Sequence, residues 1–234
     1  MSQHVTSVMP EMKRCLVVVD MQVDFITGSL ALKRAPAGQD PETLVPLINT
    51  LIQHDMFDVV VYSLDYHPPN HISFVENAAI YVPERHHVEA GEEIIAKTIA
   101  YGMVQQQVWP RHCVQDTEGV RLWPTLYRRP TALYVHKGTE PLIESYAVFG
   151  NPRFNYDTGL HSLLQTCGVT HLYFVGVAED VCVGHSALSA LTLGYDVSVI
   201  QDAVCGVNRQ DCDAMKASIV RRGGHYVCVN DVLV

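Results

Sequence analysis

Short runs of β-branched and aromatic residues, alternating with helical segments, constrain the fold of this chain more than any other feature of its sequence. Such runs are typical of strands that are buried on both faces. They occupy residues 15–19, 59–62, 132–136, 171–175, 196–200 and 225–229, and segments with helical periodicity occupy residues 43–54, 157–166, 181–193 and 209–222. This alternation predicts an α/β fold, a three-layer α/β/α sandwich around a mostly parallel sheet of about six strands.

The length of the chain agrees with one such layered domain. A chain of 234 residues with 48% hydrophobic and 18% charged residues has enough apolar side chains for one substantial core. We therefore expect a single domain over residues 1–234. Residues 75–108 are mixed in character and rich in Glu and His, so we expect them to form an excursion over the sheet rather than a core layer. This excursion is a candidate lid or a contact between copies in a homo-oligomer.

Charge and composition exclude several classes of protein. The formal net charge of −9 argues against nucleic acid as a partner, because phosphate neutralisation needs clustered Lys and Arg. No apolar run reaches the roughly 20 residues that a membrane span requires, and residues 1–14 contain no apolar signal-peptide core. The expected location is intracellular, in the cytoplasm first, with the nucleus left open. Motifs of serine hydrolases and nucleotide-binding folds are absent from the sequence.

Three residues with complementary chemistry follow predicted strands. Asp20 follows the first strand, Lys137 follows the third, and Cys182 lies at the start of the helix after the fourth. Ligands of open α/β sheets gather at the carboxyl ends of the strands, so these side chains are expected to converge. A carboxylate, an ammonium and a thiol can supply proton transfer, charge stabilisation and nucleophilic attack. The helix N-terminus and a nearby Lys are expected to favour the reactive thiolate of Cys182.

A second group of residues has the character of a metal site. Asp65, His67 and His71 follow the second predicted strand, and Pro68 and Pro69 favour a stiff turn that brings them together. Two imidazoles and one carboxylate suit a divalent metal ion. We expect one such ion as cofactor, with Zn²⁺ preferred and Fe²⁺ or Mn²⁺ as alternatives, and a fourth ligand from elsewhere in the chain.

Five segments of the sequence together resemble the nicotinamidases among the isochorismatase-like cysteine hydrolases. The segments are residues 20–25 (DMQVDF), 65–71 (DYHPPNH), 109–114 (WPRHCV), 137–138 (KG) and 176–182 (GVAEDVC), and they extend over nearly the whole chain. The resemblance implies that Asp20, Lys137 and Cys182 form a catalytic triad. It also implies that His112 completes the metal site of Asp65, His67 and His71.

The resemblance has further implications for the substrate. It implies that the metal binds the pyridine nitrogen of nicotinamide, and that Phe25, Trp109 and, less directly, Tyr146 form an aromatic wall around the ring. A cis peptide bond between Val177 and Ala178 is also implied, with the N–H groups of Ala178 and Cys182 as an oxyanion hole. Two departures stand out: Val23 replaces an Asn of many relatives, and the insertion between the second and third motifs is longer than in compact forms.

These observations predict a metal-dependent cysteine amidohydrolase that acts on a non-peptide amide. The expected reaction converts nicotinamide to nicotinic acid and ammonia through a cysteine thioester, in NAD salvage, and pyrazinamide should also be accepted. One alternative is another amidohydrolase of the same superfamily. The other is a non-catalytic, metal-stabilised binding protein in which the ligands serve only the structure. Ammonia release and its sensitivity to chelators distinguish the three.

Overall fold

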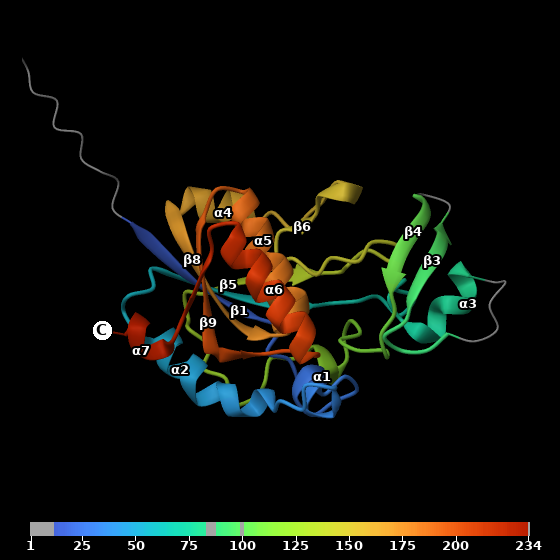
Figure 1. Ribbon diagram of the computed structural model, residues 1–234, viewed down its shortest axis with the longest axis horizontal. Helices are drawn as coiled ribbons and strands as arrows, with labels where there is room; N and C mark the ends of the chain where they lie inside the picture. The colour runs from blue at the N-terminus through green and yellow to red at the C-terminus, as the bar shows by residue number, and fades with distance from the viewer. Residues whose placement is uncertain (1–11, 83–87, 99–100, 234) are drawn as a thin grey trace, which may run out of the picture.

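A six-stranded parallel sheet forms the centre of the molecule in the computed structural model, which describes residues 12–82, 88–98 and 101–233. The strand order is β10-β9-β8-β1-β2-β5, and every neighbouring pair runs parallel. The strands are β1 (Lys13–Val19), β2 (Val59–Asp65), β5 (Leu133–Lys137), β8 (Val169–Val177), β9 (Asp196–Cys205) and β10 (His225–Val227). The predicted fold class is confirmed (Figure 1).

The central strand β1 is apolar because both faces of the sheet are covered. Cys15, Leu16, Val17, Val18 and Val19 are all fully buried. Since successive side chains of a strand point to opposite faces, Leu16 and Val18 pack in one core cluster and the other three in a second. The sheet thus separates two cores.

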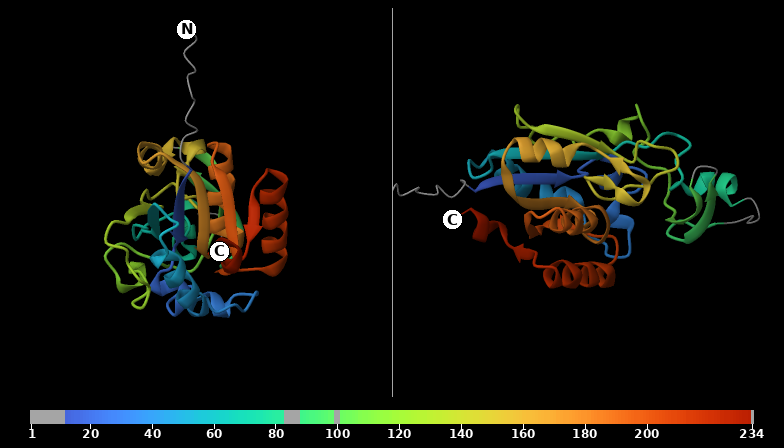
Figure 2. Two further views of the ribbon diagram at one scale, coloured as in Figure 1. Left: turned by 90° about the vertical axis from the view of Figure 1, so that its left-hand side faces the viewer. Right: turned by 90° about the horizontal axis from the view of Figure 1, so that it is seen from above.

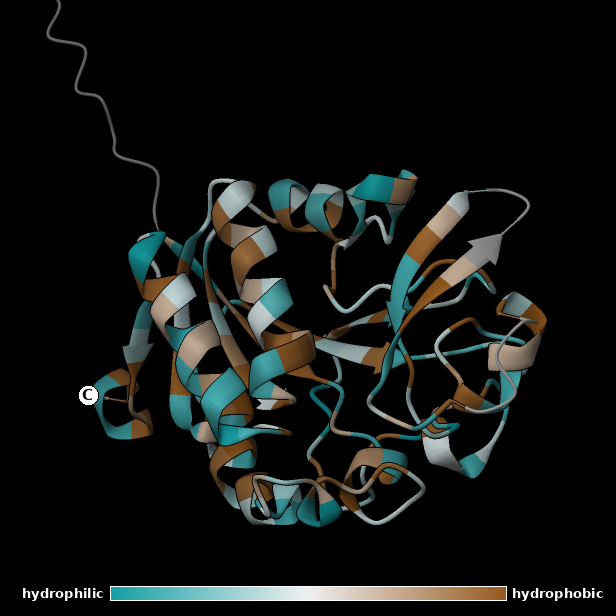
Figure 3. Ribbon diagram, turned by 45° about the vertical axis from the view of Figure 1, so that its right-hand side comes forward, coloured by the Kyte–Doolittle hydropathy of each residue, from teal (hydrophilic) through white to brown (hydrophobic). Residues whose placement is uncertain are grey.

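Each core is closed by its own helices (Figure 2). One contains side chains of α1 (Val23–Ile26), η2 (Pro41–Leu44), α2 (Val45–Gln53) and α7 (Val229–Val232). The other contains side chains of α4 (Leu160–Thr166), α5 (Gly184–Thr192) and α6 (Arg209–Arg221). Figure 3 shows hydrophobic and hydrophilic residues alternating along these covering helices, as expected for elements with one face on a core.

The described residues between 75 and 108 belong to no strand of the six-stranded sheet. They contain η3 (Val75–Asn77), α3 (Ala78–Tyr81) and the antiparallel pair β3 (Glu93–Thr98) and β4 (Gly102–Gln107). Their small apolar cluster includes Tyr81, Ile94 and Val108 and is separate from the two main cores. The expectation that this segment lies over the sheet is wrong, because it lies beyond the carboxyl ends of the strands (Figure 1). A hairpin with its own apolar cluster does not need a face of the sheet to bury its side chains.

The remaining elements connect these layers. They are η1 (Leu32–Arg34), η4 (Glu118–Val120), η5 (Pro152–Phe154), η6 (Glu179–Val183) and the short pair β6 (Gly150–Asn151) and β7 (Tyr156–Asp157). Val229 starts α7, so the last predicted strand ends earlier than expected. Among the described residues, no helix has the length and apolar character needed to cross a membrane. Residues 1–11, which make up most of the N-terminal segment without a predicted signal-peptide core, lie outside the described residues.

Candidate active site

The three residues expected at strand ends meet beside one another. Asp20 directly follows β1, Lys137 is the last residue of β5, and Cys182 lies in η6 after β8. The Nζ atom of Lys137 lies 2.8 Å from Oδ2 of Asp20 and 3.2 Å from Sγ of Cys182. Because parallel strands end at the same edge of the sheet, residues that are distant in the sequence come into direct contact.

The turn that carries Cys182 links β8 to α5. The peptide bond between Val177 and Ala178 is cis, as the resemblance implies. A π-helical turn, η6, follows, in which the N–H of Val183 donates to the carbonyl of Ala178 at 3.0 Å. Such turns are frequent at functional sites. Cys182 therefore lies just before the regular helix, where it was expected.

Burial and neighbouring charges shift the pKa values of Lys137, Asp65 and Asp20 in different directions. Burial alone would lower the pKa of Lys137, but Asp20 and Asp65 raise it well above its usual value. Burial alone would raise the pKa of Asp65, but Lys137 and His67 hold it well below its usual value. Burial raises the pKa of Asp20, and Lys137 offsets this only in part. Asp20 is therefore the carboxylate most ready to accept a proton.

The thiol of Cys182 differs from expectation. The sequence predicts a thiolate, yet burial raises the pKa of Cys182 well above its usual value, and Lys137 offsets this only in part. The side chain is only 6% exposed, so loss of solvation outweighs the nearby positive charge. A buried thiol must lose its proton as it reacts. The neighbouring carboxylates supply a proton acceptor, because an oxygen of Asp20, an oxygen of Asp65 and the sulfur of Cys182 all lie within 4.8 Å of one another.

One carboxylate connects this group to the imidazoles. Oδ1 of Asp65 accepts a hydrogen bond from Nζ of Lys137 at 2.5 Å. Its other oxygen, Oδ2, lies 3.6 Å from Nε2 of His67 and 3.8 Å from Nε2 of His112. Asp65 thus lies between Lys137 on one side and the imidazoles of His67 and His112 on the other.

Two imidazoles and Asp65 fit a divalent metal ion. Nδ1 of His67 lies 2.9 Å from the carbonyl of Gly138, and Nδ1 of His112 lies 2.7 Å from the carbonyl of Pro110. These carbonyls favour the proton on Nδ1 and leave the Nε2 lone pairs free, which is how metal-binding histidines are oriented. The buried Nε2 atom of His67 has no hydrogen-bond partner, and an orphaned acceptor of this kind suits a metal.

His71 belongs to the same cluster but faces another way. Its ring lies 4.1 Å from that of His67, while its Nε2 atom is 3.2 Å from the carbonyl of Ile143. The ligand atoms within 4.8 Å of one another that include His71 are those of His67 and Glu144. Its predicted place as a ligand beside Asp65 stays a prediction. Glu144 was not expected here, and no motif in its neighbourhood pointed to it.

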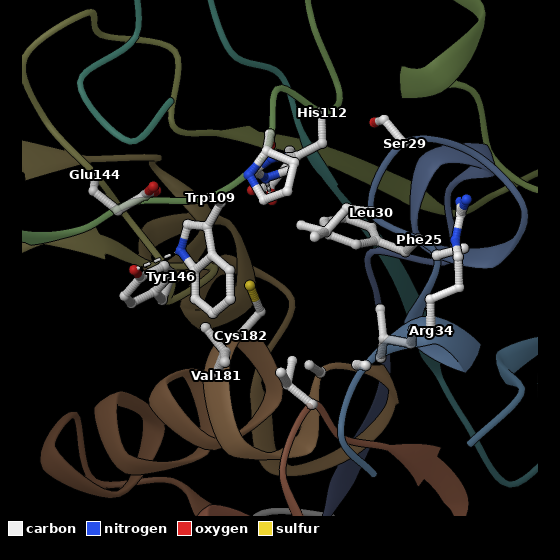
Figure 4. Close-up of a pocket in the computed structure, with 17 residues that line it drawn as sticks. Phe25, Ser29, Leu30, Arg34, Trp109, His112, Glu144, Tyr146, Val181 and Cys182 are labelled. Carbon is white, nitrogen blue, oxygen red and sulfur yellow. Dashed lines mark hydrogen bonds and ion pairs between the residues drawn. The ribbon is translucent and has the colours of Figure 1, made fainter. Parts of the chain in front are cut away.

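A cavity of about 330 Å³ opens onto both groups of residues. Cys182, Asp65 and His112 line it together with the three expected aromatic residues, Phe25, Trp109 and Tyr146. Figure 4 shows the indole of Trp109 beside the sulfur of Cys182, with Phe25 and Leu30 across the cavity and His112 above. The N–H of the indole donates to the hydroxyl of Tyr146 at 3.1 Å, which fixes this wall. The aromatic walls suit a small molecule with a flat aromatic ring.

Sequence reasoning missed the residues that support and cover the cavity. Residues 29–35, which include η1, supply much of its lining from one side. Ser63 donates to Oδ1 of Asp20 at 2.6 Å. The side-chain amide of Gln22 bonds both the N–H and the carbonyl of Asp65, at 2.9 and 2.8 Å. Gln22 lies in the segment of residues 20–25, and this segment was the only feature of the sequence that could have indicated a role for Gln22.

Comparisons with known proteins agree with this fold. The isochorismatase domain family matches residues 14–231. A nicotinamidase of Escherichia coli K12 is 34% identical over 208 residues, which cover 87% of this chain and 88% of that protein. The structure of a nicotinamidase pyrazinamidase of Acinetobacter baumanii is 33% identical, covers 96% of this chain and 100% of its own, and superposes with a TM-score of 0.81. A pyrazinamidase of Pyrococcus horikoshii in complex with zinc is 30% identical, covers 92% of this chain and 99% of its own, and has a TM-score of 0.71.

Proposed function

The chain belongs to the isochorismatase family, and from this premise we propose that it is a nicotinamidase, which hydrolyses nicotinamide to nicotinic acid and ammonia in NAD salvage. The observation that carries the proposal is the position of Asp65. Its carboxylate contacts Lys137 with one oxygen and faces His67 and His112 with the other. This arrangement supports a nucleophile and a cation site in one aromatic cavity, which suits a pyridine carboxamide as substrate.

The first half of the reaction forms a thioester. Asp20 takes the proton of Cys182 as the sulfur attacks the carboxamide carbon, and the N–H groups of Ala178 and Cys182 stabilise the oxyanion. The C–N bond then breaks, and Asp20 returns the proton to the departing ammonia. Lys137 stays protonated and balances the negative charge that accumulates on the sulfur and the carboxylates.

The second half restores the enzyme. Asp20 takes a proton from a water molecule that attacks the thioester carbon, the C–S bond breaks, and the thiol of Cys182 recovers that proton. Nicotinic acid leaves the cavity. Both halves use one base that works in either direction, which suits a carboxyl whose pKa is raised by burial.

A divalent metal ion would be held by Asp65, His67 and His112, with His71 as the further ligand. Zn²⁺ is the first choice because two imidazoles and a carboxylate match its preferences and a related pyrazinamidase contains zinc; Fe²⁺ and Mn²⁺ are alternatives. When bound, the ion would supply a Lewis acid for the ring nitrogen of the substrate. Pyrazinamide is proposed as a second substrate, because it also carries a carboxamide on an aromatic ring with a nitrogen meta to that group.

The decisive experiment compares ammonia release from nicotinamide by the native chain and by Cys182→Ala. The native chain should release ammonia, and the variant should release none while it still binds zinc. Turnover by the variant would refute the nucleophile. Absence of turnover by zinc-loaded native protein, with hydrolysis of another amide, would instead favour a different member of the superfamily. No amide hydrolysis at all would favour the non-catalytic alternative.

A further inference from the structure

The carboxylate of Asp24 joins two segments that are far apart in the sequence. Asp24 lies on the short helix α1, and its Oδ1 atom accepts a hydrogen bond from the N–H of Ser29 at 3.1 Å. Its Oδ2 atom accepts a hydrogen bond from the N–H of Cys113, 89 residues away, at 2.7 Å. Hydrogen bonds to an ionised acceptor are stronger than neutral ones, so this carboxylate is a firm link.

Two glycines enclose the same carboxylate. A Cβ atom at Gly28 would overlap Oδ1 of Asp24, and one at Gly119 would overlap Oδ2. Neither glycine has a positive φ, so close approach and not backbone conformation accounts for the absence of a side chain. At Gly119 the carboxylate alone fills the space, and at Gly28 the carboxylate and the Cα atom of Asp24 fill it. The carboxylate therefore lies close against the backbone of both glycines.

Each linked segment carries one wall of the cavity. Phe25 follows Asp24 directly, and His112 precedes Cys113 directly. Both side chains line the cavity, with their ring centroids 5.4 Å apart. Cys113 has a positive φ of 44°, a conformation that is unfavourable for a residue with a side chain and needs support from its surroundings. The hydrogen bond from its N–H to Asp24 provides such support.

We propose that Asp24 is a positioning residue, which sets the metal ligand His112 and the ring-contacting Phe25 in register across the cavity. The inference rests on the proposed function, since it concerns the same site. Asp24 is not among the residues that line the cavity. It acts through the backbone on both sides, so its loss should weaken zinc binding and substrate binding more than it changes the reactivity of Cys182.

The variant Asp24→Asn tests this proposal with little change of shape. An amide has one oxygen, and in either orientation its NH₂ group faces the N–H of Ser29 or of Cys113, so one of the two links is lost. We expect zinc affinity, titrated directly into the metal-free full chain, to fall about 10–100-fold. The KM for nicotinamide should rise by a similar factor, while the rate at which iodoacetamide alkylates Cys182 in the metal-free chain should stay within about twofold.

Two further variants make the result decisive. Asp202→Asn is the matched control, because Asp202 also accepts a backbone N–H, from Val229 at 2.9 Å, but lies outside the cavity; it should leave zinc affinity and KM unchanged. Gly119→Ala keeps the charge of Asp24 but displaces its carboxylate, so this variant should reproduce the effect of Asp24→Asn. If Asp24→Asn fails to fold, Gly119→Ala replaces it in the test. Zinc affinity and KM within twofold of the native values in either folded variant would overturn the proposal. An equal loss in zinc affinity, KM and Cys182 alkylation would show a merely structural role and also overturn it. Zinc titration needs no turnover, so this test stands apart from that of the proposed function.

Discussion

Ser63 offers a way to test the role of Asp20 as the base. Its hydroxyl donates to the carboxylate of Asp20 and lowers the pKa of that group, opposing the effect of burial. A base must be deprotonated to act, so activity is lost as the pH falls through the pKa of Asp20. Ser63→Ala should move this acid limb of kcat/KM upward by about one pH unit or more, since a hydrogen bond to a charged group contributes about 1.5–3 kcal/mol.

The control for this measurement is Ser189→Ala. Ser189 is not among the residues that line the cavity at Cys182. Its profile should match that of the native enzyme. An acid limb that stays in place in Ser63→Ala, or moves downward, would remove Asp20 from the role of base.

Lys137 should contribute to stability as well as to catalysis. The side chain is fully buried between Asp20 and Asp65, so Lys137→Met leaves two buried carboxylates without their common partner. We expect the free energy of unfolding at pH 8 to fall by about 3–5 kcal/mol. Without the lysine, burial should raise the pKa of Asp20 still further above its unfolded value. The folded variant then binds extra protons, and its stability should fall as the pH rises.

Urea unfolding at several pH values measures this effect. The double variant Asp20→Asn, Lys137→Met removes one of the unpaired charges and should recover part of the lost stability. A single variant as stable as the native chain at pH 8 would mean that the two carboxylates do not need the ammonium.

Residue chemistry shows what the sequence could and could not predict. The meeting of Asp20, Lys137 and Cys182 was predictable, because each follows a strand of one parallel sheet. The charge state of Cys182 was not, because the helix terminus can be inferred from sequence whereas the degree of burial that raises its pKa cannot. Ser63 lies inside β2 with nothing in its sequence context that distinguishes it from a core serine.

At the scale of elements, Asp180 joins the turn of Cys182 to the start of α6. Its carboxylate accepts hydrogen bonds from the N–H groups of Val207 and Asn208, at 2.9 and 2.8 Å. Val207 lines the cavity. Asp180→Ala should lower the free energy of unfolding by about 2 kcal/mol, because a charge-assisted acceptor for two N–H groups is lost. It should also raise the KM for nicotinamide.

Thermal unfolding and steady-state kinetics check both effects. Asp231→Ala is a useful control, because Asp231 accepts the N–H of Cys228 at the start of α7, away from the cavity. That variant should lose stability with no change in KM. An unchanged KM in Asp180→Ala would mean that the hydrogen bonds of Asp180 do not affect substrate binding.

The elements were predictable to different degrees. The strands were found because a sheet covered on both faces needs continuous apolar runs, and the helix over residues 43–54 because one of its faces repeats Leu and Ile. The lining from residues 29–35 was not found, since that segment is a connection with one short 3-10 helix. Its place is decided by tertiary contacts, such as the packing of Leu32 in one of the main cores. Periodicity carries no information about such a segment.

For the whole molecule, metal removal should lower stability reversibly. The proposed ligands come from separate places: Asp65 ends β2, His67 follows it, and His112 lies beyond the excursion. An ion that binds only the folded chain stabilises it by about 2.7 kcal/mol at a concentration 100 times its Kd. A chelator should therefore lower the unfolding temperature, and zinc should restore it.

A pair of histidine variants controls for indirect effects of the chelator. His112→Ala should show no chelator effect, whereas His54→Ala, at the end of α2, should respond like the native chain. An equal response of both variants would place the metal elsewhere. Because both main cores are built on the same sheet, we propose that the chain is one domain and expect one unfolding transition for the sheet and its helices.

The excursion joins this global effect to a local one. Its two ends are held together by the bridge between Phe74 and Trp109, which lie three residues from the proposed ligands His71 and His112. A two-stranded hairpin with a small apolar cluster is marginally stable by itself, so it depends on how firmly its ends are held. Metal removal should therefore speed amide hydrogen exchange in β3 and β4 well before it affects β1 and β8. Exchange measured by mass spectrometry on zinc-loaded and metal-free protein tests this, and equal protection of the hairpin in both forms would show that the excursion is stable without the metal.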